Sequence, residues 1–222
     1  MLYIPIQSQT ENPRHVQLQY LDWDPKYHVP KLISPPSGID IKSKKHIVGW
    51  ASSRETWWRN MYVKDLNVSV PVIALGKCLR TAIVADEIDK ECRSEKTGHL
   101  EMRNSKSCVF SKFYFNLIIE NTIRKDYVTE KFFDTLLIDT VPVYFGAPNI
   151  GEYSPGEGSF IDATKFSSKA ALGNYLIEVS RNETLYRSFF SWRSDPSAIE
   201  RLSKIWKNSF MNFPCRVAKS IR

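Results

Sequence analysis

Between residues 113 and 146, apolar positions fall into three blocks that polar residues separate. The first block, 113–119, is a nearly unbroken apolar run, typical of a strand that is buried on both faces. From 127 to 139 the apolar residues recur at helical spacing, at Val128, Phe132, Phe133, Leu136 and Leu137. The third block, 140–145, predicts a second strand that Gly146 ends. Strand, helix and strand in this order predict a right-handed βαβ unit with parallel strands.

The pattern on either side of this unit continues the alternation of strands and helices. Strands are predicted at 46–51, 70–75 and 159–161, and helices at 54–66, 167–181, 183–192 and 196–210. In the helix at 54–66, we expect Trp57, Met61 and Leu66 to face the core. The charged stretch 81–107 is interpreted as a loop with at most a short helix. The predicted fold class is therefore α/β, with a Rossmann-like, doubly wound parallel sheet.

A chain of 222 residues is long enough for one large domain with a substantial core. Half of the 12 prolines lie in residues 1–45, which predicts an extended connector and not a core element. We divide the chain into this connector, a ligand-binding domain at 46–217 and a short tail at 218–222. Because no run of about 18 apolar residues occurs, no membrane-spanning segment is expected.

The chain carries 31 lysines and arginines against 24 acidic residues, a net charge of +7. This balance suits an anionic ligand such as a phosphate, a nucleic acid or a membrane surface. Because the basic residues are spread along the whole chain, an ordinary solvated surface explains the charge equally well. The aromatic residues occupy predicted core positions and no nucleic-acid recognition motif occurs, so no nucleic-acid partner is expected.

The chain has four cysteines: Cys78, Cys92, Cys108 and Cys215. None of them forms a Cys-x-x-Cys pair, which argues against a zinc site, and their disulfide pairing stays open. Two N-glycosylation sequons begin at Asn67 and Asn182. Together with the even number of cysteines, the sequons favour a protein of the secretory pathway.

Ligands of parallel α/β sheets bind beyond the carboxyl ends of the strands, where helices begin. The polar residues at this place in the βαβ unit are Glu120, Asn121, Asp126, Tyr127, Glu130 and Lys131. Tyr127 and Lys131 are four residues apart, so both should lie on one face of the predicted helix, and Asp126 should cap its start. A cation in the first turns opposes the helix dipole unless an anion such as pyrophosphate also binds there. The alternative is that Glu130 and Lys131 are ordinary solvated residues.

Two other positions are open to a functional and a structural interpretation. Arg59, near the start of its helix, either points toward the same crevice or lies on the surface against Trp57 or Trp58. Glu120 directly follows an apolar run, so its carboxylate should be partly buried and needs partners. It is either a hydrogen-bonding hub or a ligand of sugar hydroxyls. None of the four histidines is expected to be catalytic.

The stretch from 115 to 162 resembles the donor-site signature of the α-1,3-fucosyltransferases, glycosyltransferase family 10. The family pattern contains a strand that ends in Phe-Glu-Asn-[Ser/Thr], then Asp-Tyr-[Val/Ile]-Thr-Glu-Lys, a Val-Pro-[Val/Ile] strand and a Ser-Phe-Ile segment. All of these parts occur here in order, with Ile119 in place of the phenylalanine. The stretch 76–78 resembles the family's Gly-x-Cys, and 186–193 resembles a segment that begins with Tyr and ends with Trp-[Arg/Lys].

The resemblance implies the C-terminal, donor-binding half of a GT-B glycosyltransferase, in which two Rossmann-like domains face each other across a cleft. It implies GDP-fucose as the donor and a glycan that contains N-acetylglucosamine as the acceptor. The reaction implied is inverting transfer of L-fucose to an N-acetylglucosamine hydroxyl of a glycoprotein, in α-1,3 linkage.

The donor-binding residues that the resemblance implies are Arg59, Glu120, Asn121, Tyr127, Glu130 and Lys131. Arg59 and Lys131 would neutralise the diphosphate. Glu130 would meet ribose or fucose hydroxyls, or lie near the developing positive charge, and these three residues are implied as catalytic. Glu120 would shape the pocket from below.

The resemblance implies no required cofactor and no fixed metal, and an Asp-x-Asp motif is expected nowhere in the chain. Manganese is expected only as a stimulant. By resemblance the protein works in the Golgi lumen, and a full-length relative is anchored in the membrane.

The family's acceptor-binding half, which holds the proposed general base, has no counterpart here apart from a remnant within the connector. A truncated donor-binding fragment or a pseudoenzyme without transfer activity is therefore the alternative to an active enzyme. The ending 215–218 resembles the family's Cys-Arg-x-Cys but has Ala218 in place of the last cysteine. A disulfide through that position is not expected.

Overall fold

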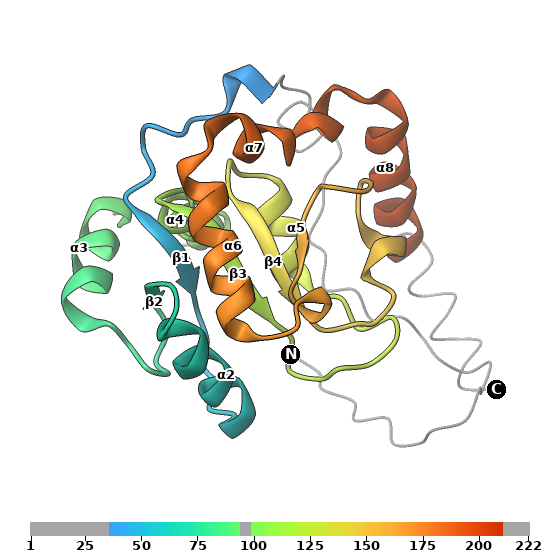
Figure 1. Cartoon of the computed structure of the whole chain (residues 1–222). Coiled ribbons are helices and arrows are strands. Elements are labelled where there is room, and N and C mark those ends of the chain that lie inside the picture. Colours follow the sequence, from blue (N-terminus) through green and yellow to red (C-terminus); the bar gives the residue numbers. More distant parts are fainter. Residues whose placement is uncertain (1–35, 94–98, 211–222) are drawn as a thin grey trace.

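The computed structural model describes residues 36–93 and 99–210, which form an α/β domain with helices on both faces of a sheet (Figure 1). The strands are β1 (His46–Trp50), β2 (Val72–Ala74), β3 (Phe113–Ile119), β4 (Val141–Phe145) and β5 (Ile161–Asp162). They form one parallel sheet in the order β2-β1-β3-β4-β5. This order confirms the predicted doubly wound α/β class.

The helices are α2 (Trp57–Asn67), α3 (Ala82–Cys92), α4 (His99–Ser111), α5 (Glu130–Leu136), α6 (Lys169–Arg181), α7 (Glu183–Ser188) and α8 (Pro196–Phe210). Short 3-10 turns are η1 (Pro36–Gly38), η2 (Ile150–Tyr153), η3 (Ala163–Lys165) and η4 (Ser191–Ser194). Helices α2 and α6 pack together on one face of the sheet, whereas α4 and α5 contact β3 from the other (Figure 1). None of these helices has the length and apolar character needed to cross a membrane.

The two strands of the βαβ unit, β3 and β4, are buried on both faces. Leu117 and Val143 belong to the core under α2 and α6. Ile118 and Tyr144 point the other way and pack with Phe132 of α5. Because both faces of β3 and β4 are covered, their sequences are continuous apolar runs without polar alternation.

The interpretation of residues 81–107 as a loop is wrong. Helix α3 occupies much of this stretch, and α4 begins within it. The stretch has few apolar residues, but Ala85, Ile88 and Cys92 form a narrow buried stripe along α3. A narrow stripe suffices here because a covalent bond adds to the packing.

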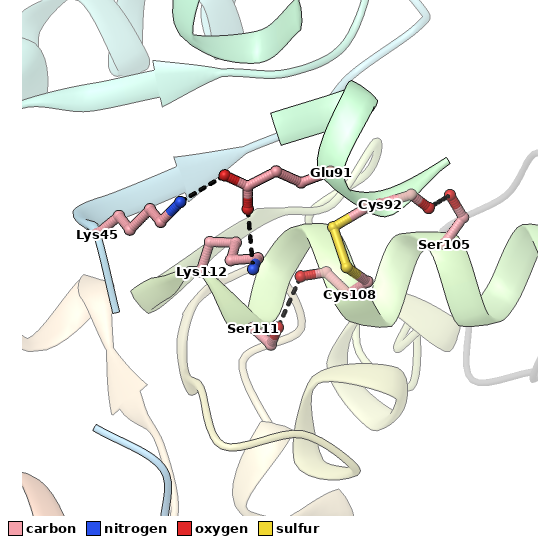
Figure 2. Close-up of a disulfide and its surroundings, with 7 residues drawn as sticks. All are labelled: Lys45, Glu91, Cys92, Ser105, Cys108, Ser111 and Lys112. Carbon is pink, nitrogen blue, oxygen red and sulfur yellow. Dashed lines mark hydrogen bonds and ion pairs between the residues drawn. A yellow bond between two sulfur atoms is a disulfide. The ribbon is translucent and has the colours of Figure 1, made fainter. Parts of the chain in front are cut away.

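That covalent bond is a disulfide between Cys92 and Cys108, which joins α3 to α4 (Figure 2). Beside it, the exposed carboxylate of Glu91 lies between the ammonium groups of Lys45 and Lys112, so α3 is also tied to the starts of β1 and β3. The pairing that the sequence left open is therefore settled for these two cysteines. Cys78 is a buried free thiol, and Cys215 lies outside the described residues.

The predicted inward face of the helix at 54–66 is wrong in two of three positions. Trp57 is 78% exposed and Met61 is 39% exposed, whereas Leu66 is buried as expected. The helix begins only at Trp57, and its buried residues are Arg59, Val63 and Leu66. Apolar periodicity could not find this phase because one of the buried positions is an arginine.

The described part of the connector packs against the domain. Arg187 of α7 donates hydrogen bonds to the carbonyl oxygens of Pro36, Ser37 and Ile39, at 2.7, 3.2 and 3.1 Å. The side chain of Ile39 is 3% exposed and belongs to the main core. Residues 36–45 thus lie along the amino end of the sheet, and a domain boundary at residue 46 stays a prediction.

Lys44 fixes the end of this segment. Its Nζ donates to the carbonyl oxygen of Ser111 at 2.9 Å and to Oγ1 of Thr140 at 3.1 Å, beside a cavity of about 380 Å³ at the amino end of the sheet. Burial lowers the pKa of Lys44 to about 7, although the carboxylates of Asp139 and Asp40 favour its charged form.

We predict that Lys44 makes the protein more stable as the pH rises from about 7 toward 9. In this window the unfolded chain binds a proton at Lys44 that the folded protein has lost. One such group changes the free energy of unfolding by at most about 1.4 kcal/mol per pH unit. Thermal unfolding at pH 7 and pH 9 should show a smaller rise for Lys44→Gln than for the exposed control Lys42→Gln. Equal rises in the two variants would contradict the prediction.

Candidate functional site

The predicted site lies at the carboxyl end of the sheet, where β1 and β3 are neighbours. From β1 the chain continues to α2 and then to β2 on one side, whereas β3, β4 and β5 follow on the other side. Ligands of doubly wound sheets bind at such a change of direction. Arg59 follows β1, and Glu120 and Asn121 follow β3, so the candidate residues flank this point.

Arg59 is buried, and its guanidinium reaches across to Asn121 at the end of β3. Its Nη1 donates to Oδ1 of Asn121 at 2.5 Å, and its Nη2 donates to the carbonyl oxygen of Arg54 at 2.7 Å and to Oγ1 of Thr56 at 3.1 Å. The side chain is 3% exposed, so the alternative of a surface arginine is wrong. All of these partners are neutral, and Nε has no partner within the described residues. Burial lowers the pKa of the guanidinium, and the negative charge of nearby Glu120 opposes this effect.

The loop that leads to Arg59 is held by the stretch 76–78, the Gly-x-Cys of the resemblance. A Cβ atom on Gly76 would collide with the backbone of Ser52, so only glycine allows the two segments to approach. Two residues further on, the backbone N–H of Cys78 donates to the carbonyl oxygen of Ser52 at 3.1 Å. This motif therefore supports the site from the adjacent strand β2.

Glu120 has no exposed surface, and its carboxylate is fully surrounded by protein. Thr129 donates to it from its backbone N–H at 2.9 Å and from its hydroxyl at 2.9 and 3.0 Å. Nζ of Lys131 lies 3.7 Å from Oε2. Burial raises the pKa of Glu120, and Lys131 and Thr129 act against this rise. The expectation of a buried carboxylate with partners is confirmed, and full burial favours a hub over a ligand of sugar hydroxyls.

Lys131 points back over the start of α5. Its Nζ donates to Oγ1 of Thr129 at 3.0 Å and lies 3.5 Å from Oε1 of Glu130. Both side chains keep about a third of their surface exposed. The ammonium therefore lies between a buried and a partly exposed carboxylate and still faces the solvent, where a ligand can reach it.

The predicted helix at 127–139 begins too early, and two expectations that rest on it are wrong. Helix α5 begins at Glu130, with Thr129 in an extended conformation before it. Asp126 has a positive φ of 66°, which interrupts helical geometry, and Tyr127 lies in the preceding loop. Tyr127 therefore shares no helical face with Lys131, and Asp126 does not cap α5. Tyr127 still lies beside the site, because its carbonyl oxygen accepts a hydrogen bond from the hydroxyl of Tyr144.

Three residues that the sequence did not indicate complete the site. Thr129 links Glu120 to Lys131, and the hydroxyl of Tyr144 donates to the carbonyl oxygen of Tyr127 at 3.2 Å. Gly146 leaves space for the side chains of Tyr144 and Glu120, since a Cβ atom there would lie 2.5 Å from the Tyr144 hydroxyl and 2.7 Å from Cγ of Glu120. A glycine directly after a buried strand was the one available signal of this close approach.

The described residues contain no cluster of three or more histidine, cysteine, aspartate or glutamate side chains that could hold a metal ion. The expectation that the chain has no Asp-x-Asp motif is wrong, because residues 22–24 form one in the connector, outside the described part of the chain. The expectation that no fixed metal is required therefore stays a prediction.

A doubly wound sheet with cationic side chains at its carboxyl edge is typical of α/β domains that bind nucleotides. Comparison with known proteins narrows this class. The family model "Glycosyltransferase family 10 (fucosyltransferase) C-term" matches residues 41–222. The chain belongs to this family.

Two relatives and one solved structure illustrate the similarity. An alpha-(1,4)-fucosyltransferase of Arabidopsis thaliana is 32% identical over 192 residues, which are 85% of this chain and 46% of the relative. A GDP-fucose protein O-fucosyltransferase 3 of Canis lupus familiaris is 27% identical over 61% of this chain and 27% of its own length. A crystal structure of an alpha1,3-fucosyltransferase with GDP-fucose shares the fold, with a TM-score of 0.53 and 23% identity over 75% of this chain and 44% of that chain. The chain thus spans less than half the length of the relatives it matches here.

We predict that Gly146→Ala destabilises the protein by about 1–3 kcal/mol, because the new methyl group must displace Tyr144 or Glu120. The matched control is Gly151→Ala, where a Cβ atom would meet nothing within 4 Å. Thermal unfolding of the two variants beside the wild type measures the difference. Equal midpoints for both variants would show that the space beside Gly146 is not restricted.

Proposed function

We propose that this chain is the donor-binding half of an inverting fucosyltransferase, which transfers L-fucose from GDP-fucose to a hydroxyl of N-acetylglucosamine in α-1,3 linkage. The observation that carries the proposal is the buried guanidinium of Arg59, whose described partners are all neutral. A buried cation is costly unless it is paired. A diphosphate at this edge of the sheet would supply the missing negative charge. Membership of the fucosyltransferase family supports fucose transfer as the reaction.

In the proposed reaction, the acceptor oxygen attacks the anomeric carbon of fucose as the bond to the GDP oxygen breaks. Negative charge grows on the departing diphosphate, where Arg59 and Lys131 stabilise it. One fixed donor of this kind typically contributes about 3–4 kcal/mol. The partly exposed carboxylate of Glu130 binds fucose or ribose hydroxyls, or stabilises the positive charge on the anomeric carbon. Asn121 and Tyr127 contact the nucleotide sugar.

Within this proposal Glu120 holds the donor site together from below. Thr129 joins its carboxylate to Lys131, so the ammonium is positioned before the donor arrives. The reaction needs no cofactor besides the donor, and manganese acts only as a stimulant. The position of each side chain and the resemblance of its motif support these proposed roles.

The acceptor is the less supported part of the proposal. The names of the relatives give an α-1,4 linkage in one case and a protein hydroxyl in another. We favour α-1,3 transfer to N-acetylglucosamine of a glycoprotein glycan because the donor-site signature resembles that subfamily. The general base and the acceptor site belong to an acceptor-binding half, and a panel of acceptors tests the choice.

A second candidate function is donor binding without transfer, as in a truncated fragment or a pseudoenzyme. It is the alternative left open because the matching family model covers the C-terminal part of the fucosyltransferases. Calorimetric titration with GDP and GDP-fucose, beside a transfer assay, separates the two functions. Binding with transfer supports the enzyme, and binding without transfer supports the second candidate. Absence of binding would contradict both.

We predict that Lys131→Ala lowers the turnover of an active form by about two to three orders of magnitude, because the growing charge on GDP loses a fixed cation. The control is Lys125→Ala, which removes an exposed lysine from the preceding loop. Turnover is measured with saturating donor and acceptor. Normal turnover in Lys131→Ala would remove this residue from the mechanism.

Lys131→Ala also leaves the buried carboxylate of Glu120 without its cation, which by itself lowers stability. The double variant Glu120→Gln with Lys131→Ala removes this side effect, since the amide oxygen can still accept from Thr129. If turnover stays low while the unfolding midpoint recovers, the loss belongs to the missing cation.

We further propose that the protein works in the Golgi lumen and carries N-glycans at Asn67 and Asn182. Both residues are exposed, and their side-chain oxygens accept from the backbone N–H groups of Val72 and Leu185. The side-chain nitrogen, which carries the glycan, remains available at each site. Expression in a secretory host should give a mass that falls after peptide N-glycosidase treatment, and Asn67→Gln and Asn182→Gln should each remove one step. An unchanged mass would reject the glycosylation sites.

A further inference from the structure

The two loops that border the site are joined by a side-chain cluster away from the catalytic candidates. Asp126 lies in the loop after β3, and Asn149 and Tyr153 lie after β4. The backbone N–H of Asp126 donates to Oδ1 of Asn149 at 3.0 Å. Oδ1 of Asp126 accepts from Nδ2 of Asn149 at 2.8 Å and from the hydroxyl of Tyr153 at 2.9 Å. We call these three residues the loop clamp.

The loop clamp holds a backbone conformation that the chain would otherwise rarely adopt. Asp126 has a φ of 66°, in the left-handed region that costs a non-glycine residue about 1–2 kcal/mol. Asparagine and aspartate tolerate this region best, which fits an aspartate here. The two bonds with Asn149 are reciprocal, so they fix the peptide and the side chain of Asp126 at once. Tyr153 is 5% exposed, so its hydroxyl is anchored in the core.

The residue that follows the clamp is Tyr127, and its backbone is held from the same side. Its carbonyl oxygen accepts from the hydroxyl of Tyr144 at 3.2 Å, and that hydroxyl in turn accepts from the N–H of Ala147 at 3.1 Å. Both anchors of the Tyr127 segment thus come from residues 144–153. The segment is fixed at Asp126 and at the carbonyl of Tyr127, so the backbone that carries the Tyr127 side chain is held on both sides.

We propose that Asn149 and Tyr153 are positioning residues for the donor: by holding Asp126 in the left-handed conformation, they orient Tyr127 before the nucleotide sugar binds. This inference rests on the proposed function, since Tyr127 matters to the donor only if the site binds one. The loop clamp raises the fraction of ligand-free molecules in which the loop already has the conformation that binds the donor. The apparent dissociation constant of the donor varies inversely with that fraction.

The first test is Tyr153→Phe, which removes one hydroxyl and keeps the buried ring. We expect the dissociation constant for GDP, measured by isothermal titration calorimetry, to rise about three- to tenfold, as for loss of one hydrogen bond of ordinary strength. The matched control is Tyr175→Phe, which removes a hydroxyl on α6, away from the two loops. In the control the dissociation constant should not change.

The second test compares two substitutions of the strained residue. Asp126→Asn keeps an acceptor oxygen and tolerates a positive φ, so GDP binding should stay within about twofold of the wild type. Asp126→Ala loses the acceptor and places a residue without local hydrogen bonds in the left-handed region, so binding should weaken about tenfold or more. If Asp126→Asn keeps GDP affinity and Asp126→Ala loses it, the effect depends on the hydrogen bonds and the backbone conformation of residue 126.

The unfolding midpoint of each variant is measured in the same samples. A dissociation constant that rises in folded Tyr153→Phe and Asp126→Ala, but not in Asp126→Asn, supports the proposal. Midpoints that fall while GDP affinity stays at the wild-type value would mean a structural role alone and would overturn it. If the wild-type protein binds no GDP, the proposed function fails and this inference fails with it. If the wild type binds and all variants bind equally, the inference alone fails.

Discussion

Glu120 places an ionisable carboxylate, without any exposed surface, at the carboxyl end of the central strand β3. Such a group destabilises a fold unless hydrogen bonds and a counter-charge surround it. The surrounding residues supply both: Thr129 donates twice, and Lys131 brings its ammonium to 3.7 Å. Because Thr129 precedes α5 directly, the requirement of Glu120 also fixes where this helix starts. The same requirement orients Lys131 toward the crevice, so a stability constraint and a binding geometry have one origin.

The opposite end of the βαβ unit is held by residues of the last family segment, 186–193. Nη2 of Arg193 donates to the carbonyl oxygens of Leu136 and Ile138, which terminate α5, and its Nη1 pairs with Asp139 at 2.8 Å. The buried hydroxyl of Tyr186 lies 2.9 Å from the carbonyl oxygens of Tyr114 and Asp139. The family signature therefore serves two purposes. Its first part forms the site, and its last part holds the helix that carries the site.

The sequence predicted the parallel sheet and the strands of the βαβ unit because buried strands leave continuous apolar runs. The sequence-based prediction failed where a buried residue is polar and where a disulfide stabilises a region that has few apolar residues. The phase of α2 depends on a buried Arg59, and the region of α3 and α4 depends on the Cys92–Cys108 disulfide. The start of α5 was missed because a positive φ at Asp126 leaves no trace in hydrophobic spacing. Motif resemblance supplied the candidate residues, but it could not say that Arg59 binds Asn121 or that Glu120 faces Thr129.

The disulfide has a further consequence for the integrity of the chain. Cys92 belongs to α3, which follows β1 and β2, and Cys108 belongs to α4, which precedes β3. A single cleavage of the backbone between these two cysteines leaves both pieces covalently linked. Since β1 lies between β2 and β3 in the sheet, the two pieces also remain paired along a strand edge. Separation of such a nicked molecule requires a reductant and the unpairing of β1 from β3, so a protease alone would not release Arg59 from the residues that face it.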